Sequence, residues 1–352
     1  MGKNYGKRIR LSPEEVEFIE RMREGDIESL SNLLQTENID PKELHSYWLK
    51  TKKFSVYVSK KKHFDPEQFM KSLLEHMEQH IPNYYPIDRP KVTDPHLLIF
   101  DPADIHIGKI AYAIETGDEY NCDIAVKRVL DGMHGLLRKS SGYPLDKIVL
   151  VVGNDALHFD TPKGTTTSGT VMDTEGLWHT IGVIAQQMYI EVIDTLRGYA
   201  PVDVIFNPSN HDFTSGWWLA QTLKAWYRNA KDVTVDADIK HRKYYRYGNS
   251  LMGLSHGDGA KLENLHALMS VESGQDWVDC KYKYWYLHHL HHKRQYRYQN
   301  GMDHIGLTIE YLRSPSAADR WHHTNGFVGM KAVEAFIHHP TEGEVARFTH
   351  YF

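Results

Sequence analysis

The segment KIVLVVGND, residues 147–155, combines an apolar run with a polar turn. An unbroken series of β-branched and aliphatic residues is typical of a strand that is buried on both faces, and Gly-Asn-Asp is typical of the turn that ends such a strand. Asp155 therefore follows a rigid element, from which its carboxylate could reach one or two cations. An ordinary strand-end turn is the alternative, because the same three residues suit it equally well.

The same combination recurs along the chain, and most of the polar clusters follow an apolar run. The other clusters are Asp104-Ile105-His106, Ser209-Asn210-His211-Asp212, Ser255-His256-Gly257-Asp258 and His288-His289-Leu290-His291-His292. Alternation along an extended chain would place Asp104 and His106 on one side of it. Taken singly, most clusters could be loops or Asx-turns. Four histidines in five residues are hard to explain by packing, because each buried imidazole needs partners. Together, the five clusters indicate a two-metal hydrolase.

Composition favours a soluble globular protein. The chain has 352 residues, of which 41% are hydrophobic and 25% charged, and its net charge of -5 gives no general attraction to nucleic acid. No apolar run is long enough to span a bilayer, so no membrane is expected. Two cysteines cannot form a disulfide framework, which favours the cytoplasm, or a host cytoplasm if the chain is phage-encoded. The 23 histidines favour metal binding.

Residues 1–90 are predicted to form a small all-α region that ends in a proline-rich linker. A capping box at residues 12–15 begins one helix, a second covers residues 27–34, and a third runs from Asp40 to about Lys50. Short helices followed by lysines resemble a helix-turn-helix module, which would bring nucleic acid as a partner. A small bundle used for packing or for assembly into a homo-oligomer is the alternative.

Residues 91–352 are predicted to form the catalytic domain, with mixed α/β structure. Strands at 96–100, 147–152 and 202–206 alternate with helices at 123–138, about 173–196 and from 217 onward. Strands at 244–247, 250–254 and 282–287, and several after 294, indicate a second sheet. The alternation predicts a sheet that is covered by helices.

In order and content, the five clusters resemble the motifs of the calcineurin-like metallophosphoesterases, which are D-x-H, G-D, G-N-H-D/E, a single H and G-H-x-H. The resemblance covers about residues 95–293. The overall layout of the chain is similar to that of phage-encoded members of the family. The segment Asp155-Ala156-Leu157-His158 also resembles the double-strand-break repair nuclease branch. It implies an α/β fold in which a four-layer β-sandwich is flanked by helices, with a two-metal centre at the strand ends. The chain departs from the pattern at Asn154, and at Ser209 and His288, where the family has glycine.

The resemblance also implies a role for each residue. The first ion would be held by Asp104, His106 and His291, Asp155 would bridge, and the second ion would be held by Asn210, His256 and His289. His211 would be the general acid or the electrophile that stabilises the transition state. Apart from the resemblance, the position of Asp212 next to His211 suggests that it holds the imidazole, and His158 could lie behind the ligands or against the substrate. Manganese is the expected ion, and iron, zinc or magnesium are alternatives.

The expected activity is hydrolysis of a phosphoester with two divalent ions. A nucleic-acid phosphodiester is the first choice of substrate, because of the possible DNA-binding front, the nuclease-like second motif and the aromatic-basic stretch 293–298. A small-nucleotide phosphodiesterase and a phosphomonoesterase are alternatives, since one metal centre can serve all these substrates. A non-catalytic DNA-binding protein on a phosphoesterase fold is the alternative from another class.

Overall fold

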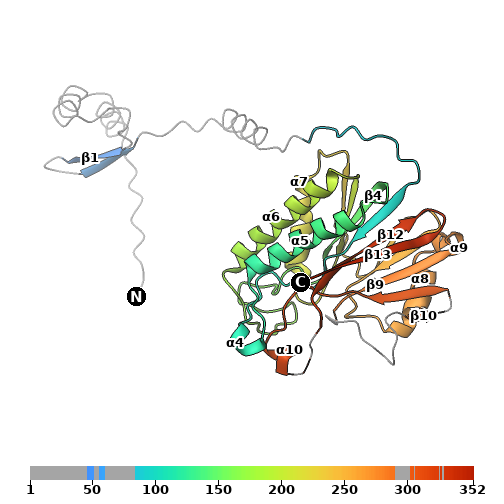
Figure 1. Ribbon diagram of the computed structural model, residues 1–352. Coiled ribbons are helices and arrows are strands. Elements are labelled where there is room, and N and C mark those ends of the chain that lie inside the picture. The colour runs from blue at the N-terminus through green and yellow to red at the C-terminus, as the bar shows by residue number, and fades with distance from the viewer. Residues whose placement is uncertain are drawn as a thin grey trace. The chain divides into compact units, whose positions relative to one another are not determined.

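The computed structural model describes residues 84–289, 306–324, 326 and 329–352, together with the backbone of three short strands outside these ranges (Figure 1). The chain divides into two compact units, Met1–His80 and Ile81–Phe352. Among the described residues, no helix is both long and apolar enough to cross a membrane.

The described part of the first unit is a β-hairpin. Strand β1 (Ser46–Lys50) pairs antiparallel with β2 (Ser55–Ser59), so that Trp48 lies opposite Tyr57. The expectation of a helix over residues 40–50 is therefore wrong at Ser46–Lys50, and the rest of that range lies outside the described residues. The segment SVYVS is rich in β-branched and aromatic residues, which favour strands, and pairing with it overrides the helical spacing of the first segment. The helices expected at 12–22 and 27–34 lie outside the described residues.

The second unit contains a six-stranded sheet in the order β13-β12-β3-β4-β5-β6. Four of its strands are parallel: β3 (His96–Phe100), β4 (Leu145–Gly153), β5 (Val202–Asn207) and β6 (Val233–Asp236). Strand β12 (Ala332–His339) is antiparallel to β3, and β13 (Gly343–Tyr351) is antiparallel to β12. The carboxyl ends of β3, β4 and β5 therefore meet at one edge, where ligands bind in open parallel sheets.

A second sheet has the order β10-β11-β9-β8-β7. Its strands are β7 (Lys243–Tyr247), β8 (Ser250–Leu254), β9 (Tyr282–Leu287), β10 (Met302–His304) and β11 (Leu307–Tyr311). Strands β8, β9 and β11 are parallel, so β8 and β9 also end at a common edge. The second sheet was expected, but β12 and β13 return to the first sheet instead of extending it.

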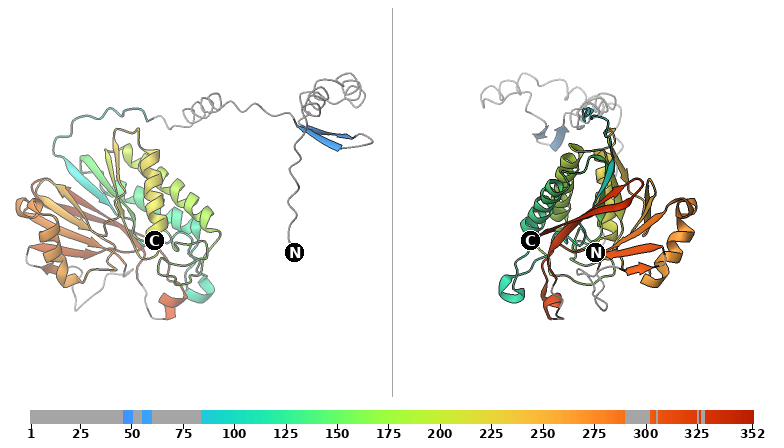
Figure 2. Two further views of the ribbon diagram at one scale, coloured as in Figure 1. Left: turned by 180° about the vertical axis from the view of Figure 1, so that it is seen from behind. Right: turned by 45° about the vertical axis from the view of Figure 1, so that its right-hand side comes forward.

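Helices cover the outer face of each sheet. The long helices α5 (Cys122–Lys139), α6 (Trp178–Arg197) and α7 (Phe213–Trp226) pack on the six-stranded sheet. The second sheet packs on its other face, and α8 (Leu265–Glu272) and α9 (Gln275–Asp279) follow beyond (Figures 1 and 2). The short α4 (Ala113–Thr116), η1 (Leu262–Asn264) and α10 (Arg320–Thr324) complete the unit. The predicted four-layer α/β sandwich is thus confirmed.

Alternation along β3 shows how the sequence builds these layers. Leu98 and Phe100 pack with the helices, whereas Leu97 and Ile99 pack against the second sheet. All four side chains are buried, and burial of each such side chain stabilises the fold by about 1.5–3 kcal/mol. Because β3 is buried on both faces, it provides a rigid base for the residues that follow it.

Two helices begin elsewhere than predicted, for local reasons. Helix α6 begins at Trp178 and not near 173, because Glu175 takes part in a loop: its backbone N–H donates to Gly108 O, and its carboxylate accepts from Cys122 N. Helix α7 begins at Phe213, before the predicted position, because the carboxylate of Asp160 accepts from the backbone N–H groups of its first turn.

Candidate metal centre

The clusters after β3 and β4 have left-handed backbone conformations. Asp104 and His106 have φ of 51° and 53°, and Asn154 and Asp155 have φ of 51° and 59°. The two turns bind each other, since Asp104 N donates to Asn154 O at 2.7 Å and His106 N donates to Asp155 O at 2.9 Å. Extended alternation, the expected reason for Asp104 and His106 to share a side, is therefore wrong. Their side chains converge through strained turns, which concentrate at functional sites.

One group of possible ligands comprises Asp104, His106 and Asp155. One ligand atom of each lies within 4.8 Å of the others, and all three side chains are buried. These residues are three of the four proposed for the first ion, including the bridging carboxylate. The fourth, His291, lies outside the described residues.

A second group surrounds one ring nitrogen. His256 Nε2 lies 3.2 Å from Asp155 Oδ2, 3.0 Å from Asn210 Oδ1 and 3.3 Å from His289 Nδ1. A single N–H can be directed at only one of these atoms, whereas a divalent cation can be shared by all four groups. The donor set therefore fits a metal ion, and it contains the four residues proposed around the second ion.

His211 lies beside the carboxylate of Asp155. Its backbone N–H donates to Asp155 Oδ1 at 3.0 Å, and its Nε2 lies 4.0 Å from Asp155 Oδ2. Its other ring nitrogen, Nδ1, lies 2.9 Å from the backbone carbonyl oxygen of His158. The buried ring of His158 in turn forms a third close group with His106 and His211. His158 thus contributes to the site through both its backbone and its side chain.

Asp212 has a different role from the one expected. It was predicted to hold the imidazole of His211, but the carbonyl of His158 does so. The buried carboxylate of Asp212 accepts from Leu157 N at 2.9 Å and from Ser209 Oγ, which itself accepts from Asp155 N at 2.9 Å. Burial raises the pKa of Asp212 to about 7. Asp212 therefore supports the turn that presents Asp155.

The charges of the site are concentrated around Asp155. Burial alone would raise its pKa, but the charges of His256 and His211 outweigh burial and hold the pKa far below its usual value. For His256, burial is outweighed by the Asp155 carboxylate, which raises the pKa to about 9. Burial, with Asp155 adding to it, raises the pKa of Asp104 to about 6. Two neighbouring buried carboxylates repel each other, and bound cations would relieve that repulsion.

Three buried residues that brace the site were not singled out from the sequence. Asp101 binds His288 and Asn154, and Ser314 Oγ donates to Asp104 O at 2.7 Å. Lys109 Nζ donates to Ala317 O at 2.7 Å and forms an ion pair with Asp319. Burial lowers the pKa of Lys109. Asp101 could have been noticed, because it directly follows the strand 96–100. Ser314 and Lys109 depend on a contact between distant parts of the chain.

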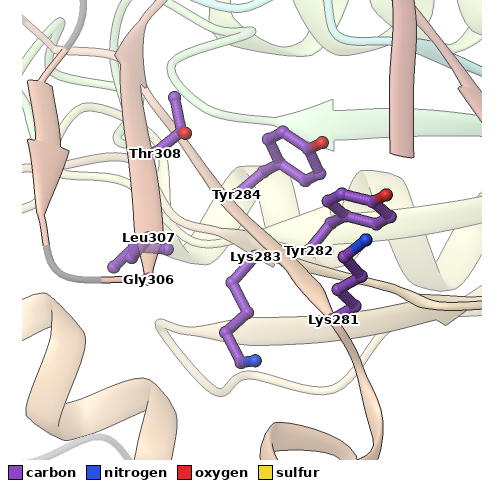
Figure 3. A pocket seen from close by; sticks show the side chains of 7 residues that line it. All are labelled: Lys281, Tyr282, Lys283, Tyr284, Gly306, Leu307 and Thr308. Carbon is purple, nitrogen blue, oxygen red and sulfur yellow. The ribbon is translucent and has the colours of Figure 1, made fainter. Parts of the chain in front are cut away.

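A separate pocket of about 290 Å³ lies at the start of β9 and β11 (Figure 3). It is lined by Lys281, Tyr282, Lys283, Tyr284, Gly306, Leu307 and Thr308. Since β9 rises about 3.3 Å per residue, this pocket lies roughly 15–20 Å from His289, which follows the other end of the strand. It is therefore distinct from the metal centre.

Comparisons with known proteins are weak. No protein-family model matches the chain, and no curated protein matches it. Two crystal structures of Vps29 from Entamoeba histolytica, a single and a double mutant, are similar at 13% and 10% identity. The matches cover 72% and 73% of this chain and 99% of each Vps29 chain, with TM-scores of 0.30 and 0.28. The function is therefore inferred from the side chains of this protein.

Proposed function

We propose that the second unit is a two-metal phosphoester hydrolase. The observation that carries this proposal is the convergence of Asp155, Asn210 and His289 on one nitrogen of His256. Carboxylate, amide and imidazole groups, of which Asp155 and His256 are buried, form the donor set of a divalent transition-metal site. When bound, two such ions would polarise a phosphoryl oxygen and activate water as the nucleophile.

The residues of this chain divide the remaining work. Asp155 is placed to contact both ions, because its carboxylate belongs to both ligand groups. The Nδ1 of His211 is engaged by the carbonyl of His158, so Nε2 is the nitrogen that can hold and deliver a proton. From Nε2 the imidazole would pass a proton to the leaving alkoxide oxygen and then regain one from water.

A phosphodiester of nucleic acid is the proposed substrate class. Besides the motif resemblance at residues 153–158, the support is an aromatic pair of which one ring, Phe213, follows His211 closely in the chain. Phe213 and the exposed His241 stack with ring centroids 5.6 Å apart and an interplanar angle of 19°. Rings of this kind can stack a nucleobase with little regard for its identity. Strand β1 removes part of the earlier support, because it occupies residues 46–50, where a helix of the DNA-binding module was expected.

The test is manganese-dependent hydrolysis of bis-p-nitrophenyl phosphate, measured beside labelled single- and double-stranded DNA. Asp155→Ala should abolish turnover of every substrate, whereas Asp131→Ala, which removes a carboxylate from the surface of α5, should not. DNA cleavage by the wild type that Asp155→Ala abolishes would support the nuclease. Hydrolysis of the small diester alone would redirect the substrate to small nucleotides. Bound metal without turnover of any phosphoester would contradict the proposed hydrolase activity and favour a non-catalytic binding protein.

A further inference from the structure

A buried carboxylate joins two turns of the metal centre. Asp101 follows β3 and is 1% exposed. Its Oδ2 lies 2.9 Å from His288 Nε2, and its Oδ1 accepts from Asn154 Nδ2 at 3.3 Å. Asn154 follows β4 of the six-stranded sheet, and His288 follows β9 of the other sheet. Asp101 therefore connects the ends of strands from both sheets.

Each partner of Asp101 precedes a candidate metal ligand. Asn154 precedes Asp155, and His288 precedes His289; both ligands lie against His256 Nε2. His289 has φ of 70°, so it shares the left-handed conformation of the turn at Asn154. A side chain other than glycine holds this conformation only where its surroundings impose it. The hydrogen bonds of Asp101 provide such a constraint, because they hold Asn154 next to Asp155 and His288 next to His289.

We propose that Asp101, Asn154 and His288 form a clamp that positions Asp155 and His289 for a shared divalent ion. The three are positioning residues, and the proposal rests on the metal centre proposed above. His288 stands where the resembled motif has glycine, and here its imidazole is 1% exposed and directed at Asp101. A buried carboxylate is costly unless its oxygens are bonded, so the clamp stabilises Asp101 as well as the turns.

The first variants change His288. Removal of a hydrogen-bonding group behind a ligand typically weakens metal binding by about 10–100-fold. His288→Ala is therefore expected to weaken Mn²⁺ binding by about 10–100-fold. His288→Gln should retain most of the affinity, because its amide N–H can occupy the place of Nε2 and donate to Asp101. Titration calorimetry of the metal-free, full-length protein with Mn²⁺ provides a readout that is independent of activity.

The matched control is His338→Ala. His338 is another buried histidine, and its Nε2 bonds to Tyr286 OH at 2.8 Å near the opposite end of β3, where it pairs with Leu97. The control should lower the melting temperature without weakening Mn²⁺ binding. His288→Ala should lower the melting temperature and also weaken Mn²⁺ binding. This difference separates a positioning role from a merely structural one.

A second route uses the other arm of the clamp. Asn154→Gly removes the amide but accepts the φ of 51°, so it should weaken Mn²⁺ binding even if His288→Ala fails to fold. The double variant Asn154→Gly with His288→Ala should lose less binding free energy for Mn²⁺ than the sum of the losses in the two single variants, because both changes act through Asp101.

The outcomes separate the clamp from the metal centre itself. If the wild type binds Mn²⁺ and either His288→Ala or Asn154→Gly binds it equally well, the clamp is wrong and the metal centre stands. If the wild type binds no divalent ion, both proposals fall.

Discussion

His211 is the residue whose chemistry is most closely determined by its surroundings. Its backbone N–H is bonded to Asp155 and its Nδ1 is engaged by the carbonyl of His158, so the ring has one orientation and one available nitrogen. The side chain is 17% exposed, in contrast to the buried Asp155 beside it. A substrate can therefore reach Nε2, which suits a proton donor better than a structural ligand.

Replacement of His211 tests this role directly. His211→Ala should lower kcat by about 10²–10⁴-fold, the usual contribution of a general acid, while the protein still binds Mn²⁺. The exposed His134 on α5 offers a matched control, because His134→Ala should leave kcat unchanged. Steady-state kinetics with the small diester and parallel Mn²⁺ titrations would measure both effects. A His211→Ala variant with wild-type kcat would remove His211 from the mechanism.

At the level of single residues, the sequence predicted that Asp104, His106, Asp155, Asn210, His256 and His289 lie together, but not how they are held. Asp155 and His256 were selected because a polar residue at the end of a buried strand faces a shared edge. The left-handed φ of Asp104 and the link from Asp101 to His288 follow from tertiary contacts, which local alternation does not encode. The role expected of Asp212 was wrong because a backbone carbonyl, which leaves no trace in sequence, holds His211.

At the scale of elements, the ends of the parallel strands place the site. Strand β4 ends at Gly153, whose φ of 84° begins the left-handed turn. A Cβ on Gly153 would clash with the carbonyl oxygen of Asn207 on β5 and lie 2.8 Å from the ring of Phe206. Glycine is therefore required where the ends of β4 and β5 come closest.

Two glycine substitutions with opposite expected effects test this explanation. Gly153→Ala should lower the free energy of unfolding by more than about 1–2 kcal/mol, the cost of the left-handed conformation alone. Gly182→Ala in α6 should raise it by about 0.5–1 kcal/mol, because a Cβ there meets nothing within 4 Å and alanine favours a helix. Urea unfolding followed by circular dichroism would measure both. Equal effects of the two changes would contradict the close approach at Gly153.

Long apolar elements were predictable, whereas elements defined by their partners were not. The strand 96–100 and the helix over 123–138 were located to within a residue. The apolar pattern of the strand reflects burial on both faces, and that of the helix reflects burial on one face. Strands β1 (SYWLK) and β6 (VTVD) were missed, since each mixes polar and apolar residues and is stabilised by the strand beside it. The return of β12 to the first sheet is likewise a matter of topology.

Over the whole second unit, burial between the two sheets makes stability depend on pH. His338 lies in this layer with Nε2 bonded to Tyr286 OH, and burial, together with the charge of Arg347, lowers its pKa from 6.5 to about 3. Below pH 6.5 the unfolded chain therefore binds a proton that the folded chain does not. The folded state loses stability as the pH falls from about 6.5 toward about 3, by up to about 1.4 kcal/mol per pH unit from this group.

His338→Gln removes this titration while it keeps a polar side chain beside Tyr286. Between pH 6.5 and 4, the free energy of unfolding of the metal-free variant should fall less steeply than that of the wild type. Urea unfolding at a series of pH values gives both slopes. Identical slopes would show that His338 is protonated as readily in the folded protein as in the unfolded chain.

The four-layer architecture brings the ends of β3, β4, β5, β8 and β9 to one place, and the central claim is that two metal ions bind there. Anomalous diffraction at the manganese absorption edge, from crystals grown with Mn²⁺, tests that claim most directly. We expect two peaks that share Asp155, one beside Asp104 and His106 and the other beside Asn210, His256 and His289. A single peak, or peaks remote from Asp155, would contradict the two-metal centre.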